Sequence, residues 1–465
     1  MKKLENNFFT FYLILLPLLV AISLDLTPFS KSMESFWQKL NLNIIKTQSE
    51  HWMENASFIL RHQPWQTFLW QQVAENQFEK KDFSGSINSY NQLESLQPLS
   101  VEQKITLGHA YWNTDQIEVA YSTWQGILED TDIEEDDFLE LVKTQQTAND
   151  WYGAYLTLLK WQQLYPESTE MEYSLLLSQI IFDPIAAKEN PSFKENKKLQ
   201  SLPTELDELI ENDNPVFQLI LAGNILSKIN EWNYSVAAYA YATRLDPDYA
   251  EGWAYYGNAL TNVGKNGYFA LDKAFSLSPK SKIVRAFLAS YWRSHNDIDK
   301  SLEIYQSLAD EEPDQPVWQQ ELGNTYISAG NLENALKAFQ KSVEIDPNNV
   351  NNWIILARFC GDFRVEIQEI GLPAARQALA IDTNNWEAND VIGWLFLLLG
   401  DYTSAERFLT SAFEQAPESD LVNLHLGQVF FLQNKMEAAT YFLNRCIEFS
   451  ENYEIIQLAR KFLNP

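Results

Sequence analysis

Prolines recur along this chain at nearly equal intervals, and that spacing limits its possible folds more than any other feature of the sequence. Pro279, Pro313 and Pro347 are separated by two steps of 34 residues, and Pro98 and Pro166 by twice that length. The prolines in this series, with further steps of 81, 32 and 70 residues, are Pro98, Pro166, Pro247, Pro279, Pro313, Pro347 and Pro417. A fixed period of this length indicates a stack of similar structural units rather than one globular core. Such a stack offers a long surface and usually no catalytic pocket.

Residues 316–349 show the internal pattern of one unit. Apolar residues in each half of this unit have helical spacing. Gly330-Asn331 between the halves is typical of a turn, because glycine ends a helix at low steric cost. Pro347 ends the second half, since proline cannot continue a helical hydrogen-bond ladder, and the small residues Gly323 and Ala335 allow two helices to approach closely. The unit resembles the tetratricopeptide repeat (TPR), in which 34 residues form a helix, a turn and a second helix.

The same pattern recurs in about ten units, over roughly four-fifths of the chain. These units are residues 67–100, 101–134, 135–168, 216–249, 250–281, 282–315, 316–349, 350–385, 386–419 and 420–453. The resemblance implies an all-α fold, a right-handed TPR solenoid of about ten helix–turn–helix repeats. It predicts an N-terminal TPR subarray over 67–168 and a C-terminal subarray over 216–453, followed by a capping helix over 454–465. The alternative, a helical bundle with accidental periodicity, is disfavoured by this many units in register.

Residues 169–215 depart from the pattern. A first helix breaks at Asp183-Pro184, a polar stretch follows over 188–198, and residues 206–210 have the spacing of a remaining helix. We interpret the span as a degenerate repeat with an inserted loop, and as a candidate hinge between the two subarrays. A related helical-repeat family remains an alternative for the irregular region 135–215.

The N-terminus has the composition of a membrane-targeting segment. Residues 1–7 form a short basic tail, and residues 8–24 are apolar with three exceptions. A helix over 8–24 would be about 26 Å long, near the lower limit for a membrane span. We predict a transmembrane signal anchor, with a cleavable signal peptide as the alternative. Residues 25–66 would form a stalk and lead-in helices, and the chain would be a single-pass membrane protein with its repeats outside the cytoplasm.

Charge and motif content exclude several classes of function. The formal net charge of −29 argues against a nucleic-acid backbone or an anionic membrane surface as the main partner. The sequence holds no HExxH motif, no Cys/His pair at metal-ligand spacing, no GxxxxGK[ST] or GxGxxG loop and no GxSxG elbow. The acidic run over 129–140 lacks the turn glycine of a calcium loop. We therefore predict no catalytic, cofactor or metal site, and we expect Cys360 and Cys446 to be buried and unpaired.

One row of polar residues is a candidate binding surface. In the TPR family the first helices line the concave face, and ligand contacts often come from the residue after the conserved glycine. The residues at this position in four successive units are Asn224, Asn258, Ser290 and Asn324. Side-chain amides both donate and accept hydrogen bonds, so this row is suited to the backbone of an extended peptide. The alternative is that asparagine is simply common at this position of the repeat.

A second candidate surface lies near the C-terminus, where residues 391–399 are apolar around the whole helix. A repeat helix needs only one buried stripe, so we expect the surplus to face the groove as a partner-binding patch. The predicted patch consists of Trp394, Leu397, Leu398, Leu424 and Phe431. Burial under the capping helix, or self-association, is the alternative.

These observations favour a membrane-anchored, non-catalytic scaffold that binds partner proteins or peptides through its concave TPR surface. The alternative function is an accessory subunit of a cell-envelope enzyme that makes or exports a glycan or another polymer. The sequence identifies no partner and leaves the oligomeric state open.

Overall fold

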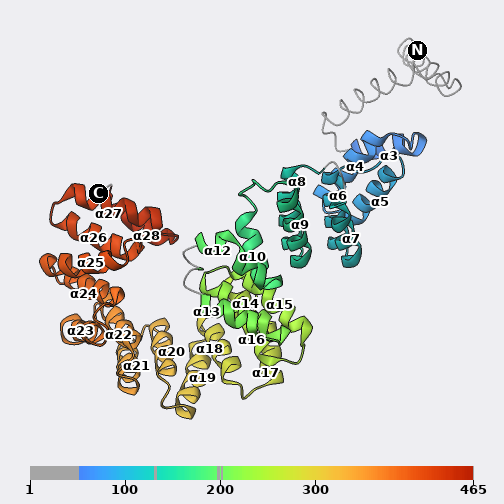
Figure 1. Cartoon of the computed structure of the whole chain (residues 1–465). Coiled ribbons are helices and arrows are strands. Elements are labelled where there is room, and N and C mark those ends of the chain that lie inside the picture. The colour runs from blue at the N-terminus through green and yellow to red at the C-terminus, as the bar shows by residue number, and fades with distance from the viewer. Residues whose placement is uncertain (1–51, 130–132, 196–198, 200–202, 464–465) are drawn as a thin grey trace, which may run out of the picture. The chain divides into compact units, whose positions relative to one another are not determined.

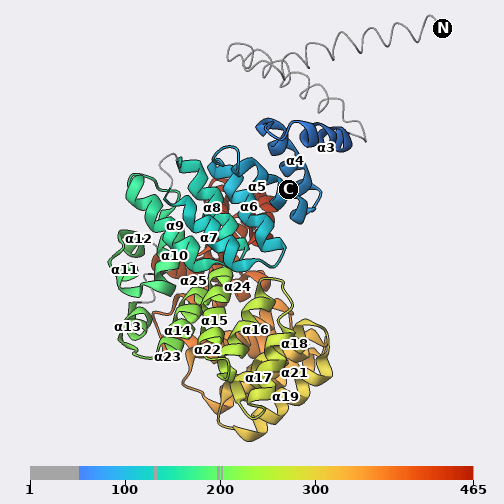
Figure 2. The ribbon, with the colours of Figure 1, turned by 90° about the vertical axis from the view of Figure 1, so that its right-hand side faces the viewer.

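The computed structural model describes residues 52–129, 133–195, 199 and 203–463. These residues fold into α-helices and one short π-helix, with no strand among them, which confirms the all-α TPR solenoid. Helices follow one another in pairs, and Figures 1 and 2 show the two helices of each pair side by side. The second helix of a pair also packs on the first helix of the next pair, as α15 does on α16 and α25 on α26.

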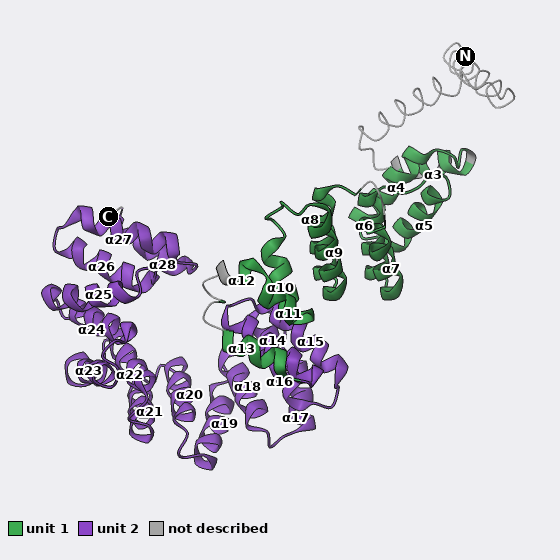
Figure 3. Ribbon diagram, viewed as in Figure 1, with its two compact units in different colours: residues 1–212 green, residues 213–465 purple. Residues whose placement is uncertain are grey.

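The chain divides into two compact units, one ending at Asn212 and the other starting at Asp213 (Figure 3). The described helices of unit 1 are α3 (Trp52–His62), α4 (Thr67–Glu79), α5 (Phe83–Glu94), α6 (Val101–Asn113), α7 (Ile117–Ile127), α8 (Glu135–Thr147), α9 (Trp151–Leu164), α10 (Glu172–Phe182), α11 (Pro184–Glu189), α12 (Pro191–Glu195) and α13 (Pro203–Glu211). Asp183 ends α10, and its side chain accepts a hydrogen bond from the Ala186 amide at 3.1 Å as the N-cap of α11.

The described residues of unit 2 form six helix pairs, a seventh pair interrupted by the π-helix, and a final single helix. Its elements are α14 (Pro215–Lys228), α15 (Trp232–Leu245), α16 (Ala250–Asn262), α17 (Tyr268–Leu277), α18 (Lys282–Ser294), α19 (Ile298–Glu311), α20 (Pro316–Ser328), α21 (Leu332–Ile345), α22 (Val350–Asp362), η2 (Ile367–Gly371), α23 (Leu372–Ile381), α24 (Trp386–Leu398), α25 (Tyr402–Gln415), α26 (Asp420–Leu432), α27 (Met436–Phe449) and α28 (Tyr453–Leu463). The predicted extents of the subarrays, the degenerate repeat and the cap stay predictions.

A small residue on the first helix and a large one on the second set how closely the helices of a pair approach. Gly323 lies against the Phe339 ring, and a Cβ at Gly323 would be 2.7 Å from Phe339 Cζ. The same pairing, with the large residue sixteen positions after the small one, occurs at Ala74 and Tyr90, Gly108 and Trp124, Gly223 and Tyr239, Ala289 and Tyr305, Gly393 and Leu409, and Gly427 and Leu443. Each large side chain in this set is buried between the helices of its pair.

The turn inside several of the pairs has the same local structure. Gly330 adopts a positive φ of 69°, and Asn331 after it caps α21 by accepting a hydrogen bond from the Asn334 amide at 3.1 Å. A left-handed residue ends the first helix, and an Asp or Asn side chain satisfies a free amide of the second. Asn296 and Asp297 repeat the arrangement before α19.

The prediction of a single-pass membrane protein with an extracytoplasmic array is contradicted. Among the described residues, no helix is long and apolar enough to cross a membrane. The longest of these helices have 14 residues, or about 21 Å at the rise of an α-helix, against a bilayer core of about 30 Å. The predicted tail over 1–7 and anchor over 8–24 lie outside the described residues, as does the predicted stalk up to residue 51.

Candidate functional site

The predicted polar row lies on four successive first helices of unit 2. Asn224 is on α14, Asn258 on α16, Ser290 on α18 and Asn324 on α20. Each follows the buried small residue that contacts the second helix of its own pair, at Gly223, Gly257, Ala289 and Gly323. Successive residues of an α-helix are rotated by about 100° around the helix axis, so each residue of the row points away from that contact. Asn324 is exposed, and the other three side chains are half-buried.

The four side chains of the row differ in their hydrogen bonds. Asn224 Oδ1 accepts a hydrogen bond of 2.7 Å from the Tyr239 hydroxyl, and Ser290 lies beside the Tyr305 hydroxyl. In the described part of the chain, the side-chain amides of Asn258 and Asn324 have no hydrogen-bond partner. Asn258 and Asn324 therefore keep both donor and acceptor groups available.

An ion pair that the sequence did not predict joins the helices of this row. Arg293 on α18 donates a hydrogen bond of 2.6 Å to Glu321 on α20. The buried Tyr305 ring lies under Arg293, 5.7 Å from the guanidinium carbon to the ring centroid. Burial raises the pKa of the Tyr305 hydroxyl far above its usual range, and the Glu321 charge adds to the effect. Contacts within the chain therefore already occupy the surface beside Ser290.

The predicted exposure of the C-terminal apolar patch is wrong for two of its five residues. Leu397 is 8% exposed, in a core with Leu409 and Leu426, and Leu424 is 3% exposed. Leu424 is buried because α28 covers it, where it packs with Ala459. The sequence prediction assigned these side chains to the groove, and for Leu424 the structure instead agrees with the stated alternative of burial under the capping helix.

The other three patch residues are half-buried and have contacts within the chain. Phe431 meets Phe462 of α28 edge to face, with ring centroids 5.3 Å apart, and Leu398 packs at the edge of the core around α22 to α24. The Trp394 ring stacks on His425 at 5.5 Å, and His425 Nδ1 lies 2.8 Å from Asp390 Oδ1 in a buried pair. A binding role for the patch stays a prediction, with less free surface than expected.

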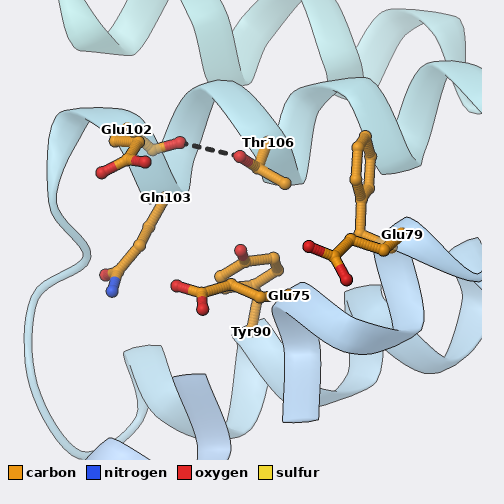
Figure 4. A pocket seen from close by; sticks show the side chains of 7 residues that line it. Glu75, Glu79, Tyr90, Glu102, Gln103 and Thr106 are labelled. Carbon is orange, nitrogen blue, oxygen red and sulfur yellow. Dashed lines mark hydrogen bonds between the residues drawn. The ribbon is translucent and has the colours of Figure 1, made fainter. Parts of the chain in front are cut away.

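A pocket in unit 1, absent from the sequence predictions, lies between α4, α5 and α6 (Figure 4). It has a volume of about 330 Å³, within the range typical of ligand sites. Its lining consists of Glu75, Phe78, Glu79, Tyr90, Glu102, Gln103 and Thr106. Helical spacing places the first three together on one face of α4 and the last three on one face of α6, but the sequence does not show that the two faces border one cavity.

Two parts of the sequence match models of a known repeat family. Two family models described as tetratricopeptide repeat match residues 320–349 and 391–453. No curated protein matches the sequence. Among solved structures, yeast Tom70 is 12% identical with a TM-score of 0.45, over 85% of this chain and 95% of that one. A tetratricopeptide repeat protein from Parabacteroides merdae is 17% identical with a TM-score of 0.40, over 54% of this chain and 99% of that one.

Proposed function

We propose that this chain, which is a tetratricopeptide repeat protein, is a non-catalytic scaffold that binds an extended segment of a partner protein along the first helices of unit 2. Repeats of this family support protein–protein interaction, and their fold is typically a non-catalytic interaction module. No observation among the described residues supports the envelope-enzyme alternative or attachment to a membrane.

The observation that carries the proposal is the pair of unpartnered carboxamides at Asn258 and Asn324. A carboxamide donates to a peptide carbonyl and accepts from a peptide N–H, so it matches a backbone of any sequence. Both residues sit at the same repeat position, two pairs apart on α16 and α20. Several such contacts along an array would bind an extended segment through its backbone, with no requirement for particular side chains. Binding of this kind suits a scaffold.

Site-specific photocrosslinking tests the proposal. A photoreactive amino acid replaces Asn258, Asn324 or Asn348 in the affinity-tagged full chain, within cells that normally make it. Asn348 serves as the matched control, because it is an exposed asparagine of unit 2 in the turn between α21 and α22. We expect the same partner protein to crosslink from positions 258 and 324 and not from 348.

The crosslinked peptide identifies the partner segment by mass spectrometry. In a second step, Asn258→Ala combined with Asn324→Ala should weaken binding of that synthetic segment by roughly thirtyfold, since two lost hydrogen bonds on the order of 1 kcal/mol each total about 2 kcal/mol. Equal crosslinking from all three positions, or none from positions 258 and 324, would contradict binding along the row.

A further inference from the structure

The pocket of unit 1 carries negative charge that the described chain does not neutralise. Glu75 and Glu79 come from α4 and Glu102 from α6, and Figure 4 shows these carboxylates around one space. Glu75 accepts hydrogen bonds of 2.8 Å and 3.0 Å from the side-chain amides of Gln71 and Gln72. In residues 52–129, 133–195 and 203–463, no lysine or arginine forms an ion pair with these three glutamates. Carboxylates held together in this way attract a cation.

Aromatic side chains complete the wall of the pocket. The Phe78 ring contacts Phe83 in a T-shaped arrangement at 5.4 Å and His109 in a stacked arrangement at 6.2 Å. Burial lowers the pKa of His109, so its imidazole is neutral near pH 7 and supplies no counter-charge. Tyr90 is 1% exposed, and its hydroxyl lies towards Thr106. An ammonium or guanidinium group is stabilised both by an aromatic face and by carboxylate acceptors.

An amide in the same lining offers a hydrogen-bond donor to a ligand. Gln103 is 7% exposed, and its Oε1 accepts a 3.0 Å hydrogen bond from the Ser100 amide in the capping box of α6. This bond fixes the orientation of the carboxamide, so Nε2 remains as a donor. Among the described residues, no protein group accepts a hydrogen bond from Gln103 Nε2. A backbone carbonyl beside a bound side chain would satisfy this donor, which a bare cation cannot do.

Negative charge extends from the pocket to the helix pair of α8 and α9. Burial raises the pKa of Glu140 on α8, and the charges of Glu102 and Asp137 raise it further. Glu140 is thus close enough to Glu102 for the two to repel. A basic side chain entering the pocket would relieve part of this repulsion, and further basic residues in the same segment would face acids along α6 and α8.

We propose that the pocket between α4, α5 and α6 receives a lysine or arginine side chain from an extended segment of a partner protein. Glu75, Glu79 and Glu102 accept its N–H groups, the Phe78 ring packs on its charged end, and Gln103 Nε2 donates to a backbone carbonyl of the segment. The inference goes beyond the proposed function, because it concerns unit 1 and requires no contact with the asparagine row of unit 2.

Peptide binding to the full chain tests this assignment. The probes are short acetylated and amidated peptides in which glycine alternates with arginine, with lysine, or with citrulline, the neutral analogue of arginine. Binding is measured by fluorescence anisotropy at physiological salt, where charges more than about 8 Å apart are largely screened. We expect the arginine and lysine peptides to bind and the citrulline peptide not to bind.

Two double variants of equal net charge show whether binding depends on the pocket or on the overall negative charge of the protein. Glu75→Gln with Glu79→Gln should weaken binding of the basic peptides by roughly tenfold. Glu118→Gln with Glu167→Gln removes the same charge at exposed positions of unit 1 outside the pocket and should change binding by less than about twofold. Thr106→Lys places an amine of the chain itself in the pocket and should block the peptides in a protein that remains folded by circular dichroism.

The results distinguish this inference from the proposed function. Asn258→Ala with Asn324→Ala should leave binding of the basic peptides unchanged. Equal weakening by the two glutamate pairs, undiminished binding to Thr106→Lys, or no binding of any basic peptide would overturn the pocket assignment while leaving the asparagine row untouched.

Discussion

At the scale of the residue, adding one methyl group should have opposite effects at two glycines of the α6/α7 pair. A Cβ at Gly108 would overlap Trp124 Nε1, which donates a 3.2 Å hydrogen bond to the Ile105 carbonyl. Gly126 on α7 has open space around the same position. We expect Gly108→Ala to lower the free energy of unfolding by about 1–3 kcal/mol through overpacking. Gly126→Ala should raise it by about 0.5–1 kcal/mol, because alanine loses less backbone entropy on folding.

Urea unfolding of the full chain, followed by circular dichroism and by tryptophan fluorescence, measures both effects. Each alanine variant is the control for the other, since the chemical change is identical. A decrease of similar size for both would show that the close contact between Gly108 and Trp124 does not set the helix spacing.

Both cysteines should be unreactive in the folded protein. Burial raises the pKa of Cys360 to about 12 and that of Cys446 to about 12, with smaller contributions from Glu366 and Asp420. The thiolate is the reactive form, so near pH 8 neither residue should be alkylated by iodoacetamide until the protein unfolds. Mass spectrometry of peptides labelled with and without urea checks this. Rapid labelling of either cysteine in the native protein would contradict its burial.

At the scale of the element, α28 closes the end of unit 2. It covers Leu424 and packs with Cys446 through Ala459. Removing residues 453–465 should expose these side chains. A leucine that becomes fully exposed lowers the free energy of unfolding by about 1.5–3 kcal/mol. We expect Cys446 to become reactive while Cys360 stays protected, and the truncated chain to self-associate through the uncovered face.

Alkylation kinetics and sedimentation measure the two effects of this truncation. The control is Tyr453→Ser, because Tyr453 belongs to α28 but is 72% exposed. This control should leave Cys446 protected. Unchanged protection of Cys446 in the truncated chain would show that other elements bury it.

Elements that depend on local sequence were predictable, and those that depend on contacts between helices were not. Gly330-Asn331 predicts its turn because a positive φ and an N-cap are requirements of adjacent residues. The burial of Leu424 depends on where α28 packs, and the spacing of apolar residues within α26 holds no such information. The pocket depends likewise on Glu75 and Glu102, which border one cavity only once α4 and α6 both pack against α5. The predicted row at Asn258 and Asn324 rests on the family pattern, and its binding role stays a prediction.

At the scale of the whole molecule, a linear array should transmit a local weakness mainly to neighbouring pairs. Stability in such arrays is approximately a sum of repeat stabilities and interfaces between neighbours. The α6/α7 pair contacts α5 and α8 directly, and it lies in unit 1. We expect Gly108→Ala to increase hydrogen exchange in α4 to α9 and to leave exchange in α14 to α28 at the level of the unsubstituted chain. Hydrogen exchange with mass spectrometry on the full chain resolves these segments, with Gly126→Ala as the control. Faster exchange spread evenly over both units would mean that the chain unfolds as one cooperative body, and the binding surfaces of the two units could then not be treated as separable.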